Sequence, residues 1–250
     1  MINGSMPEEG QISVCWLGAA GFLIRSRDAA IGIDVYLSNS CMMENGAFKR
    51  LTAPGAAPRE LELDYLIASH EHGDHLDEGS IHELIRPDNK TILLCPAATK
   101  EAALRYGVAE DRIVGLDRGQ TLTFGDITIR AVFSDHGPYT PDAIGCFITI
   151  AGKVVYFIGD SGFRTDFLGC IGPHEPIDVF LVPINGKFGN PDARDAAYFV
   201  QMLKPKLAIP CHFWLSKEHG GDPGEFAECC KKIAPGTGVA VLAVGETIYV

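Results

Sequence analysis

Basic side chains are scarce in this sequence. Its 250 residues include 21 lysines and arginines against 32 aspartates and glutamates, which gives a formal net charge of −11. A protein that binds nucleic acid through the phosphate backbone needs a basic face to displace counterions. The charge balance therefore excludes a generally basic surface, and we predict that nucleic acid is not a partner.

Long apolar runs and paired cysteines are also lacking. No run approaches the roughly 18 residues of a membrane span, and the start MINGSMPEEG has neither the basic nor the apolar region of a secretory signal. The eight cysteines form no C-x-x-C pair, and several lie inside apolar runs. This usage is typical of reduced, mostly buried thiols and not of a disulfide framework or a thiolate zinc site. We therefore expect a cytoplasmic protein without a membrane partner.

The hydrophobic pattern predicts strands in meanders, with helices between the groups and no internal repeat or linker. Such an order is typical of a layered α/β domain in which two sheets carry helices on their outer faces. Residues 38–59 show little periodicity, and a loop of this length is more often functional than accidental. Helices are expected at 79–87, 98–107, 191–205 and 222–236, and strands at 11–17, 21–26, 29–37, 63–69, 90–96, 111–116, 120–125, 126–134, 144–152, 153–160, 177–184, 206–211, 238–245 and 246–250.

The segment HEHGDH at residues 70–75 concentrates side chains that need a partner once they are buried. Imidazoles and carboxylates in a core require a hydrogen bond, a charge partner or a metal. In an extended segment residues i and i+2 point the same way, so His70 and His72 can bind one ion. Asp74 and His75 follow at once and can turn toward a second ion.

Three further polar residues, His136, Asp160 and His212, each lie at the end of a predicted strand, as His70 does. Loops at strand ends, held by a rigid scaffold, are where functional groups concentrate. Two neighbouring ions also need a bridging carboxylate to offset their mutual repulsion, and Asp160 is well placed for that role. The sequence therefore predicts a metal site at one edge of the sheet stack.

Single histidines after strands are more often capping or hydrogen-bonding residues, and we assign His82, His174 and His219 to that class. The cluster at 70–75 is different, because H-x-H-x-D-H would arise by chance in about one of a few thousand chains of this histidine content. A loop that binds metal only adventitiously would also not predict the later residues at strand ends.

HEHGDH resembles the H-x-H-x-D-H signature of the metallo-β-lactamase superfamily. The segments SDHG, FIGDSG and IPCHF follow in the order of that superfamily's other ligands, and WLGAAGFLIRS with IGIDVYLS is similar to its opening hairpin and next strand. The resemblance covers nearly the whole chain. It implies a four-layer αββα sandwich, formed by residues 1–250 as one hydrolase domain, with two metals at the sheet edge.

The resemblance also implies which residues bind each metal. By position, His70, His72 and His136 would bind metal one, and Asp74, His75 and His212 would bind metal two, with Asp160 bridging. Asp34 would accept a hydrogen bond from the ligand loop and hold a histidine tautomer. All these ligands offer nitrogen or oxygen, so their softness leaves Zn²⁺, Mn²⁺ and Fe²⁺ open. The resemblance implies Mn²⁺ or Zn²⁺, with Fe²⁺ as a further candidate.

The segments VPINGKFGN, PDAIG and CHFWLSKEHGGDPGEF are most similar to the ascorbate-6-phosphate lactonase group of that superfamily. Two divalent ions lower the pKa of a bridging water toward about 7, and the resulting hydroxide can attack an ester carbonyl while Asp74 orients it. We therefore predict a metal-dependent hydrolase of a lactone or carboxylic ester of a sugar acid, with or without a phosphate. A phosphodiesterase on the same fold and a non-catalytic metal-binding domain are the alternatives.

Substrate contacts are expected from the loop that follows the strand predicted at 177–184. Asn185 and Lys187 should share the edge of the metals there, so we predict that they contact a small anionic substrate. Arg164 and Lys217 are assigned equally to the solvated surface and to the substrate. The sequence leaves the oligomeric state open, a homo-oligomer included.

Overall fold

Two sheets of seven strands each organise the chain, in a computed structural model that describes residues 6–138 and 140–250. Residues 1–5, part of the segment in which we predict no secretory signal, lie outside the described residues. The first sheet has the order β14-β1-β2-β3-β4-β5-β6. Its strands are β1 (Ser13–Gly18), β2 (Gly21–Arg25), β3 (Ala30–Ile33), β4 (Tyr65–Ile67), β5 (Ile92–Cys95), β6 (Ile113–Gly115) and β14 (Thr247–Tyr249).

The second sheet has the order β13-β12-β11-β10-β9-β8-β7. Its strands are β7 (Thr121–Phe124), β8 (Ile127–Phe133), β9 (Ile144–Ile150), β10 (Lys153–Phe157), β11 (Val179–Pro183), β12 (Leu207–Cys211) and β13 (Gly238–Val239). The helices are α1 (Glu78–Leu84), α2 (Ala97–Arg105), α3 (Phe167–Ile171), α4 (Ala193–Leu203) and α5 (Pro223–Ile233), with 3₁₀ turns η1 (Pro58–Glu60) and η2 (Glu110–Arg112).

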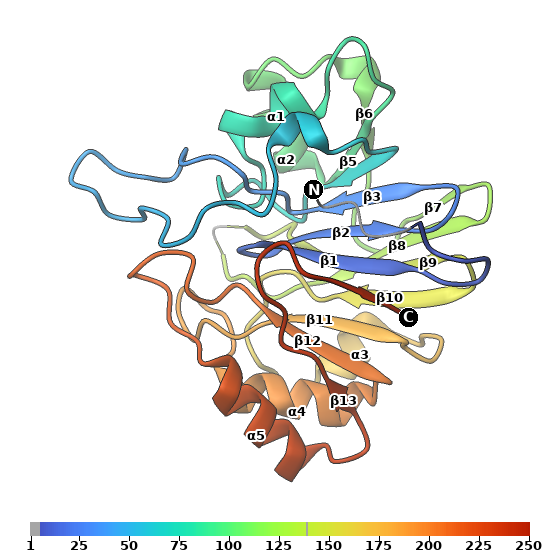
Figure 1. Ribbon diagram of the computed structural model, residues 1–250, viewed down its shortest axis with the longest axis vertical. Helices are drawn as coiled ribbons and strands as arrows, with labels where there is room; N and C mark the ends of the chain where they lie inside the picture. Colours follow the sequence, from blue (N-terminus) through green and yellow to red (C-terminus); the bar gives the residue numbers. More distant parts are fainter. Residues whose placement is uncertain (1–5, 139) are drawn as a thin grey trace.

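Helices cover the outer faces of both sheets. In Figure 1, α1 and α2 lie at the top and α4 and α5 at the bottom, with the strands between them. Because successive side chains of a strand point to opposite faces, β1 contributes to two cores. Val14 and Trp16 belong to the core that joins the two sheets, whereas Cys15 and Leu17 pack in the core that includes Leu84 of α1. The predicted αββα sandwich is confirmed.

Strand direction decides which loops meet. In the second sheet, β10, β11 and β12 run parallel, and β8 runs the same way because both β8 and β10 pair antiparallel with β9. In the first sheet, β3, β4 and β5 also run parallel. The carboxyl ends of parallel strands lie at the same edge of a sheet, where such folds place their binding loops. The loops after these strands therefore gather at one edge of each sheet.

Three parts of the chain differ from the sequence-based expectations. The strand expected at 29–37 ends at Ile33, because Asp34 takes a left-handed backbone conformation with φ 43°. The strand expected at 238–245 comprises only Gly238–Val239. Helix α3 was not predicted, since its five residues are too few to show helical periodicity. Residues 38–57 form the loop that extends farthest at the left of Figure 1.

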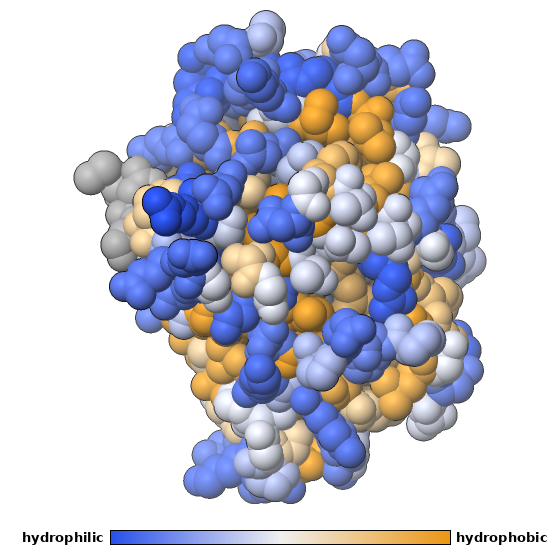
Figure 2. Space-filling view, turned by 90° about the vertical axis from the view of Figure 1, so that its right-hand side faces the viewer, coloured by the Kyte–Doolittle hydropathy of each residue, from blue (hydrophilic) through white to orange (hydrophobic). Residues whose placement is uncertain are grey.

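The face of the molecule away from the long loop is polar, with dispersed apolar side chains (Figure 2). Figure 2 shows the right-hand side of the molecule of Figure 1, away from the long loop, and there hydrophilic side chains surround scattered hydrophobic patches. Apolar side chains dispersed in this way are normal on a folded protein. Within the part of the chain that the structure describes, no helix is long and apolar enough to cross a membrane.

Candidate metal centre

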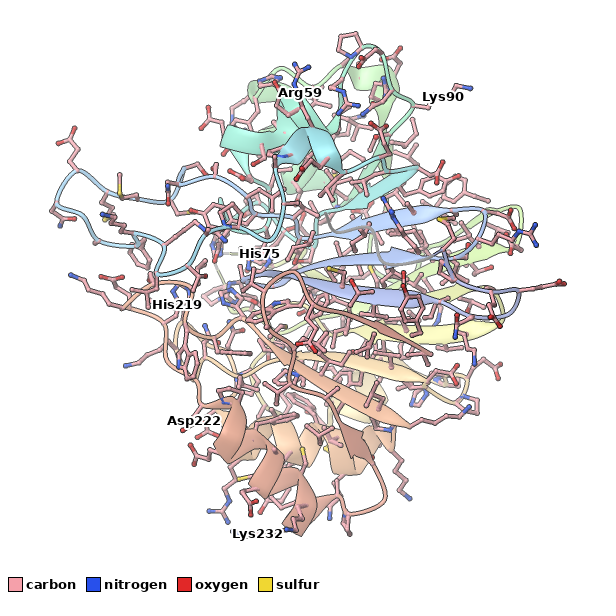
Figure 3. The ribbon with its side chains drawn as sticks, viewed as in Figure 1. Arg59, His75, Lys90, His219, Asp222 and Lys232 are labelled. Carbon is pink, nitrogen blue, oxygen red and sulfur yellow. The ribbon has the colours of Figure 1, made fainter. Side chains whose placement is uncertain are left out.

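The predicted metal ligands meet at the edge where the strands of both sheets end. His70 follows β4, His136 follows β8, Asp160 follows β10 and His212 follows β12. Figure 3 shows His75 at this edge, at the left-hand ends of the strands, with His219 close by beneath the long loop. Residues separated by more than a hundred positions in the sequence are thus brought together by the sheet stack.

Three imidazoles form the first ligand set. The Nδ1 atom of His72 lies 3.0 Å from Nε2 of His70 and 3.1 Å from Nε2 of His136. His70 is fully buried, while His72 borders the cavity described below. These are the residues expected to bind metal one, and their ring nitrogens converge on one point.

A hydrogen-bond relay beneath the ligands sets two histidine tautomers. Oδ2 of Asp34 accepts a hydrogen bond from Oγ of Ser69 at 2.6 Å, so this hydroxyl has no hydrogen left to donate elsewhere. The 2.9 Å contact between Ser69 Oγ and His70 Nδ1 must therefore have His70 as donor. His75 Nδ1 likewise donates to Asp34 Oδ2 at 2.6 Å. In their neutral forms both histidines therefore have the lone pair on Nε2, which is the atom that faces the site.

The ring nitrogens and carboxylate oxygens of the second ligand set lie close to one another. Nε2 of His212 lies 3.3 Å from Nε2 of His75 and 3.4 Å from Oδ2 of Asp74. Asp74 Oδ1 lies 3.8 Å from His75 Nε2. These are the residues expected at metal two. His219 approaches the same set, with its Nε2 4.0 Å from Asp74 Oδ2 and its ring stacked on that of His212 at 5.0 Å.

Asp160 lies between the two sets. Its Oδ2 atom is 3.7 Å from His136 Nε2, 3.4 Å from His75 Nε2 and 3.5 Å from His212 Nε2. Asn190 donates to the same oxygen at 2.7 Å and fixes the carboxylate. The other oxygen, Oδ1, is buried without a hydrogen-bond partner among the described residues. One carboxylate thus touches a histidine of the first set and two of the second, the position that a bridging ligand requires.

Electrostatics keep the carboxylates of the site ionised. Burial would raise the pKa of Asp160, but the imidazoles of His212 and His75 hold it well below its usual range. Burial would lower the pKa of His75, but the carboxylates of Asp160, Asp34 and Asp74 raise it well above its ordinary value. The site therefore concentrates negative charge that positive charge must balance, and metals bind ionised carboxylates.

The donor set fits divalent ions. Ring nitrogens and carboxylate oxygens within 4.8 Å of one another form the groups His70–His72–His136, His75–Asp160–His212 and Asp74–His212–His219. Converging imidazole lone pairs and an unpartnered buried carboxylate oxygen are unfavourable unless a cation lies among them. Nitrogen and oxygen ligands suit Zn²⁺, Mn²⁺ and Fe²⁺ alike, so the donors favour two metals without selecting one ion.

A cavity of about 540 Å³ opens over the ligands. Its floor is made of site residues, and its walls are largely apolar. Among the described residues that line it, the charged side chains are acidic and no lysine or arginine occurs. The lining residues are Ser40, Cys41, Met43, Phe48, His72, Gly73, Asp74, Glu78, Tyr106, His136, Asp160, Phe188, His212, Leu215 and His219.

Asp77 anchors the long loop that forms one wall of this cavity. It begins α1 as its N-cap, and its carboxylate accepts hydrogen bonds from the backbone amides of Leu37, Ser38 and Gly79. Three serine hydroxyls, those of Ser38, Ser40 and Ser80, donate to it as well. A single buried carboxylate therefore connects the ligand loop and α1 to the start of the cavity wall.

Sequence reasoning missed several residues of the site. His219 was assigned a capping or hydrogen-bonding role, and its Nδ1 does lie 2.9 Å from Ser216 Oγ, but its ring also lines the cavity beside His212. Asn190 and Ser69, which hold Asp160 and His70, carry no sequence signal beyond their places after strands. Phe48 and Phe188 lie in loops without periodicity, so only the folded chain shows that both face the cavity.

The two predicted substrate contacts lie near the site but outside the cavity lining. Asn185 is buried, and its amide atoms have no hydrogen-bond partner among the described residues. Lys187 is exposed to solvent. Arg164 forms ion pairs with Asp135 at 3.0 Å and with Asp166 at 2.8 Å. Their contact with a substrate stays a prediction.

The arrangement of ligands and sheets defines a class of proteins, and comparison with known sequences agrees. Residues 30–213 match the family model described as the beta-lactamase superfamily domain. Because this match spans well over half of the chain, the protein belongs to that superfamily, the metallo-β-lactamases.

Within the superfamily, the chain is similar to a group named UPF0173. It is 26% identical to a UPF0173 metal-dependent hydrolase of Carboxydothermus hydrogenoformans over 249 residues, which cover 95% of this chain and 99% of the relative. It superposes on Igni18, a metallo hydrolase from Ignicoccus hospitalis, with a TM-score of 0.76 at 22% identity, over 96% of this chain and 98% of the other. The metallo-β-lactamase fold protein YhfI from Bacillus subtilis gives a TM-score of 0.71 at 20% identity, over 96% and 99% of the two chains.

Proposed function

We propose that this metal-dependent hydrolase acts on a lactone or a similar carboxylic ester with two divalent ions in its site. The observation that supports the proposal is the sharing of Asp160 between two converging ligand sets at the floor of a cavity. When bound, two such ions activate water as a nucleophile at neutral pH and polarise the carbonyl that it attacks. Mn²⁺ and Zn²⁺ are the ions we propose, with Fe²⁺ as the further candidate.

The side chains of the site have separable roles in this reaction. His70, His72 and His136 would hold the first ion, and His75 and His212 the second, with Asp160 between them. Asp74 is partly exposed to the cavity, and its Oδ2 lies 3.4 Å from His212 Nε2. It can therefore bind the second ion through one oxygen and accept a hydrogen bond from the attacking water through the other.

The substrate class is argued from the shape of the site. A cavity of several hundred cubic ångströms is the usual size for a small-molecule site, which favours an enzyme over a domain that only binds metal. The sugar-acid form of the substrate was expected from the resemblance to the ascorbate-6-phosphate lactonase group, with Asn185 and Lys187 as its expected contacts. Since neither lines the cavity, the ester class is proposed here without a required anionic group.

The test is a hydrolysis panel on protein loaded separately with Mn²⁺, Zn²⁺ and Fe²⁺. We expect turnover of lactones or esters that disappears on chelation and returns with the metal. Turnover of bis-p-nitrophenyl phosphate with none of any lactone or ester would instead identify a phosphodiesterase. Metal binding without hydrolysis of any compound would show a metal-binding domain.

A further inference from the structure

Two phenylalanines from distant parts of the chain face each other at the mouth of the cavity. Phe48 comes from the long loop after β3, and Phe188 from the loop between β11 and α4. Their ring centroids are 5.9 Å apart, and each ring also contacts His219, at 6.1 Å and 5.4 Å respectively. Because the ring of His219 stacks on that of His212, aromatic surface runs without a break from the mouth to the metal ligands.

Both phenylalanines occupy a backbone conformation that disfavours them. The φ angles are 58° at Phe48 and 56° at Phe188, in the left-handed region where bulky side chains are rarely found. Strain of this kind persists only where the surrounding structure enforces it, and it gathers at functional sites. Phe48 is held by a hydrogen bond from its amide to Oε2 of Glu218 at 3.0 Å.

The turn at Phe188 has a geometry that does not suit a phenylalanine. The amide of Asn190 donates to the carbonyl of Lys187 at 3.0 Å, and the two central residues, Phe188 and Gly189, both have positive φ. A turn of this type I′ geometry favours asparagine followed by glycine at its centre. The phenylalanine at that place is 54% exposed, so burial in the core does not compensate the strain. The same turn ends at Asn190, which holds Asp160.

The described cavity lining offers an anionic ligand no lysine or arginine. The charged side chains among the described lining residues are Asp74, Asp160 and Glu78. Two divalent ions, when bound, would bring four positive charges, of which these carboxylates offset three, so the positive charge that remains would lie among the metal ligands and not between the phenylalanines. Lys49 and Lys187, the chain neighbours of Phe48 and Phe188, lie outside this lining, as does Lys217, which is 3.7 Å from Glu218. A negative group placed between the phenylalanines would lose its water without a lysine or arginine in the described cavity lining to pair with.

From the aromatic mouth, its strained backbone and the acidic lining, we propose that the substrate is uncharged and carries a flat apolar group that packs against Phe48 and Phe188. Its ester or lactone carbonyl then faces the metal ligands. This inference rests on the proposed hydrolase function. An aromatic ring offers the area and the edge-to-face or offset geometry that neighbouring aromatic side chains favour.

The experiment compares three lactones: dihydrocoumarin, which is aromatic and neutral, δ-valerolactone, which is neutral without the ring, and a carboxylated dihydrocoumarin. We expect kcat/KM to fall in that order. Phe188→Asn and Phe48→Leu should each lower kcat/KM for dihydrocoumarin by about tenfold or more and leave δ-valerolactone within about twofold. Met42→Ala is the matched control, because Met42 is exposed in the same loop but lies outside the cavity lining.

Phe188→Asn also separates a binding role from a structural one. This variant gives the turn the Asn-Gly sequence that its geometry favours, so the melting temperature should hold or rise while hydrolysis of dihydrocoumarin falls. A lower melting temperature with equal losses on both neutral lactones would show that Phe188 only supports the fold, and would overturn the inference.

A binding measurement tests the preference for an uncharged aromatic ligand separately from the hydrolase function. The lactam analogue of dihydrocoumarin resists hydrolysis, and calorimetry should find that it binds wild type at least about tenfold more tightly than δ-valerolactam, with the difference lost in Phe188→Asn. Lactam binding with this preference but no lactone hydrolysis would refute the hydrolase function alone. Hydrolysis that favours the carboxylated lactone, with the preference removed by Lys187→Ala, would refute the uncharged substrate.

Discussion

Asp34→Asn should weaken binding of both metals without removing a ligand. Asparagine keeps the shape of aspartate and tolerates the left-handed backbone at this position, where φ is 43°. Asp34 accepts from three donors: the amide of Ser69 at 2.7 Å, the hydroxyl of Ser69 at 2.6 Å and Nδ1 of His75 at 2.6 Å. An amide has one accepting oxygen, so the substituted side chain cannot satisfy all three.

Each orientation of the new amide has a cost. If its oxygen accepts from the Ser69 amide, its NH₂ faces the Ser69 hydroxyl and His75, which must then act as acceptors. The hydroxyl would donate to His70 Nδ1, and both histidines would carry their hydrogen on Nε2, where the metal binds. In the reverse orientation the NH₂ lies against the buried N–H of Ser69, which costs about 1–3 kcal/mol. Loss of an outer partner of this kind lowers metal affinity about 10- to 100-fold, or roughly 1.4–2.7 kcal/mol.

The assay is a competition titration against a chromophoric chelator, with circular dichroism to show that the variant is folded. Ser69→Ala is the matched control, since it removes the link to His70 but leaves His75 bonded to Asp34. It should weaken the first metal and spare the second. If folded Asp34→Asn bound both metals within about twofold of wild type, the tautomer argument would be wrong.

Three other perturbations test separate parts of the structure. Asp160→Ala should reduce the content of both metals, whereas His212→Ala should mainly reduce that of the second; elemental analysis that gave the two variants the same stoichiometry would contradict a bridging role. Asp77→Ala, which leaves several buried donors without an acceptor, should cost about 3–5 kcal/mol in the free energy of unfolding and expose the loop at 38–57 to proteolysis, as urea titration and limited digestion would show. Burial would raise the pKa of Asp178, but its hydrogen bond from Lys206 and that from a backbone amide lower it below the ordinary value. Its stabilisation is then present above the ordinary carboxyl pKa and lost as the pH falls through the lowered one. Asp178→Asn should therefore lose about 2 kcal/mol in urea titrations at pH 7, and the loss should shrink steadily as the pH is lowered below about 4; a loss that does not change with pH would exclude the charge as its source.

Much of the architecture is readable from local patterns. Apolar alternation reports which segments are strands, and residues that follow strands can be recognised before the sheets are assembled, as His136 and His212 were. The i, i+2 spacing of His70 and His72 is likewise a local property, because the period of an extended chain places both side chains on one side. A single sequence therefore reveals mainly the interactions between residues that are close together along the chain.

The turn at Phe188 shows what local patterns leave undetermined. Lys187 follows a strand at the correct edge, which made it a candidate for the substrate, but position after a strand does not determine the direction of a side chain in a turn. The turn at Phe188 and Gly189 leaves the phenylalanine at the cavity and the lysine outside its lining. Positive φ at a bulky residue is enforced by tertiary contacts, so no local propensity could predict it.

The sequence by itself determined the ligand types, their order and the layered sheets, because these depend on residue chemistry and on the twofold period of strands. Only the tertiary structure decided which atoms of the ligands face the site. The hydrogens of His70 and His75 are fixed by Asp34 and Ser69, which reach them across the ends of β3 and β4. The aromatic mouth is formed by Phe48 and Phe188, which lie in two loops and are 140 residues apart in the sequence. Contacts at that separation form only when the two sheets pack, since nothing in either loop alone brings the rings together.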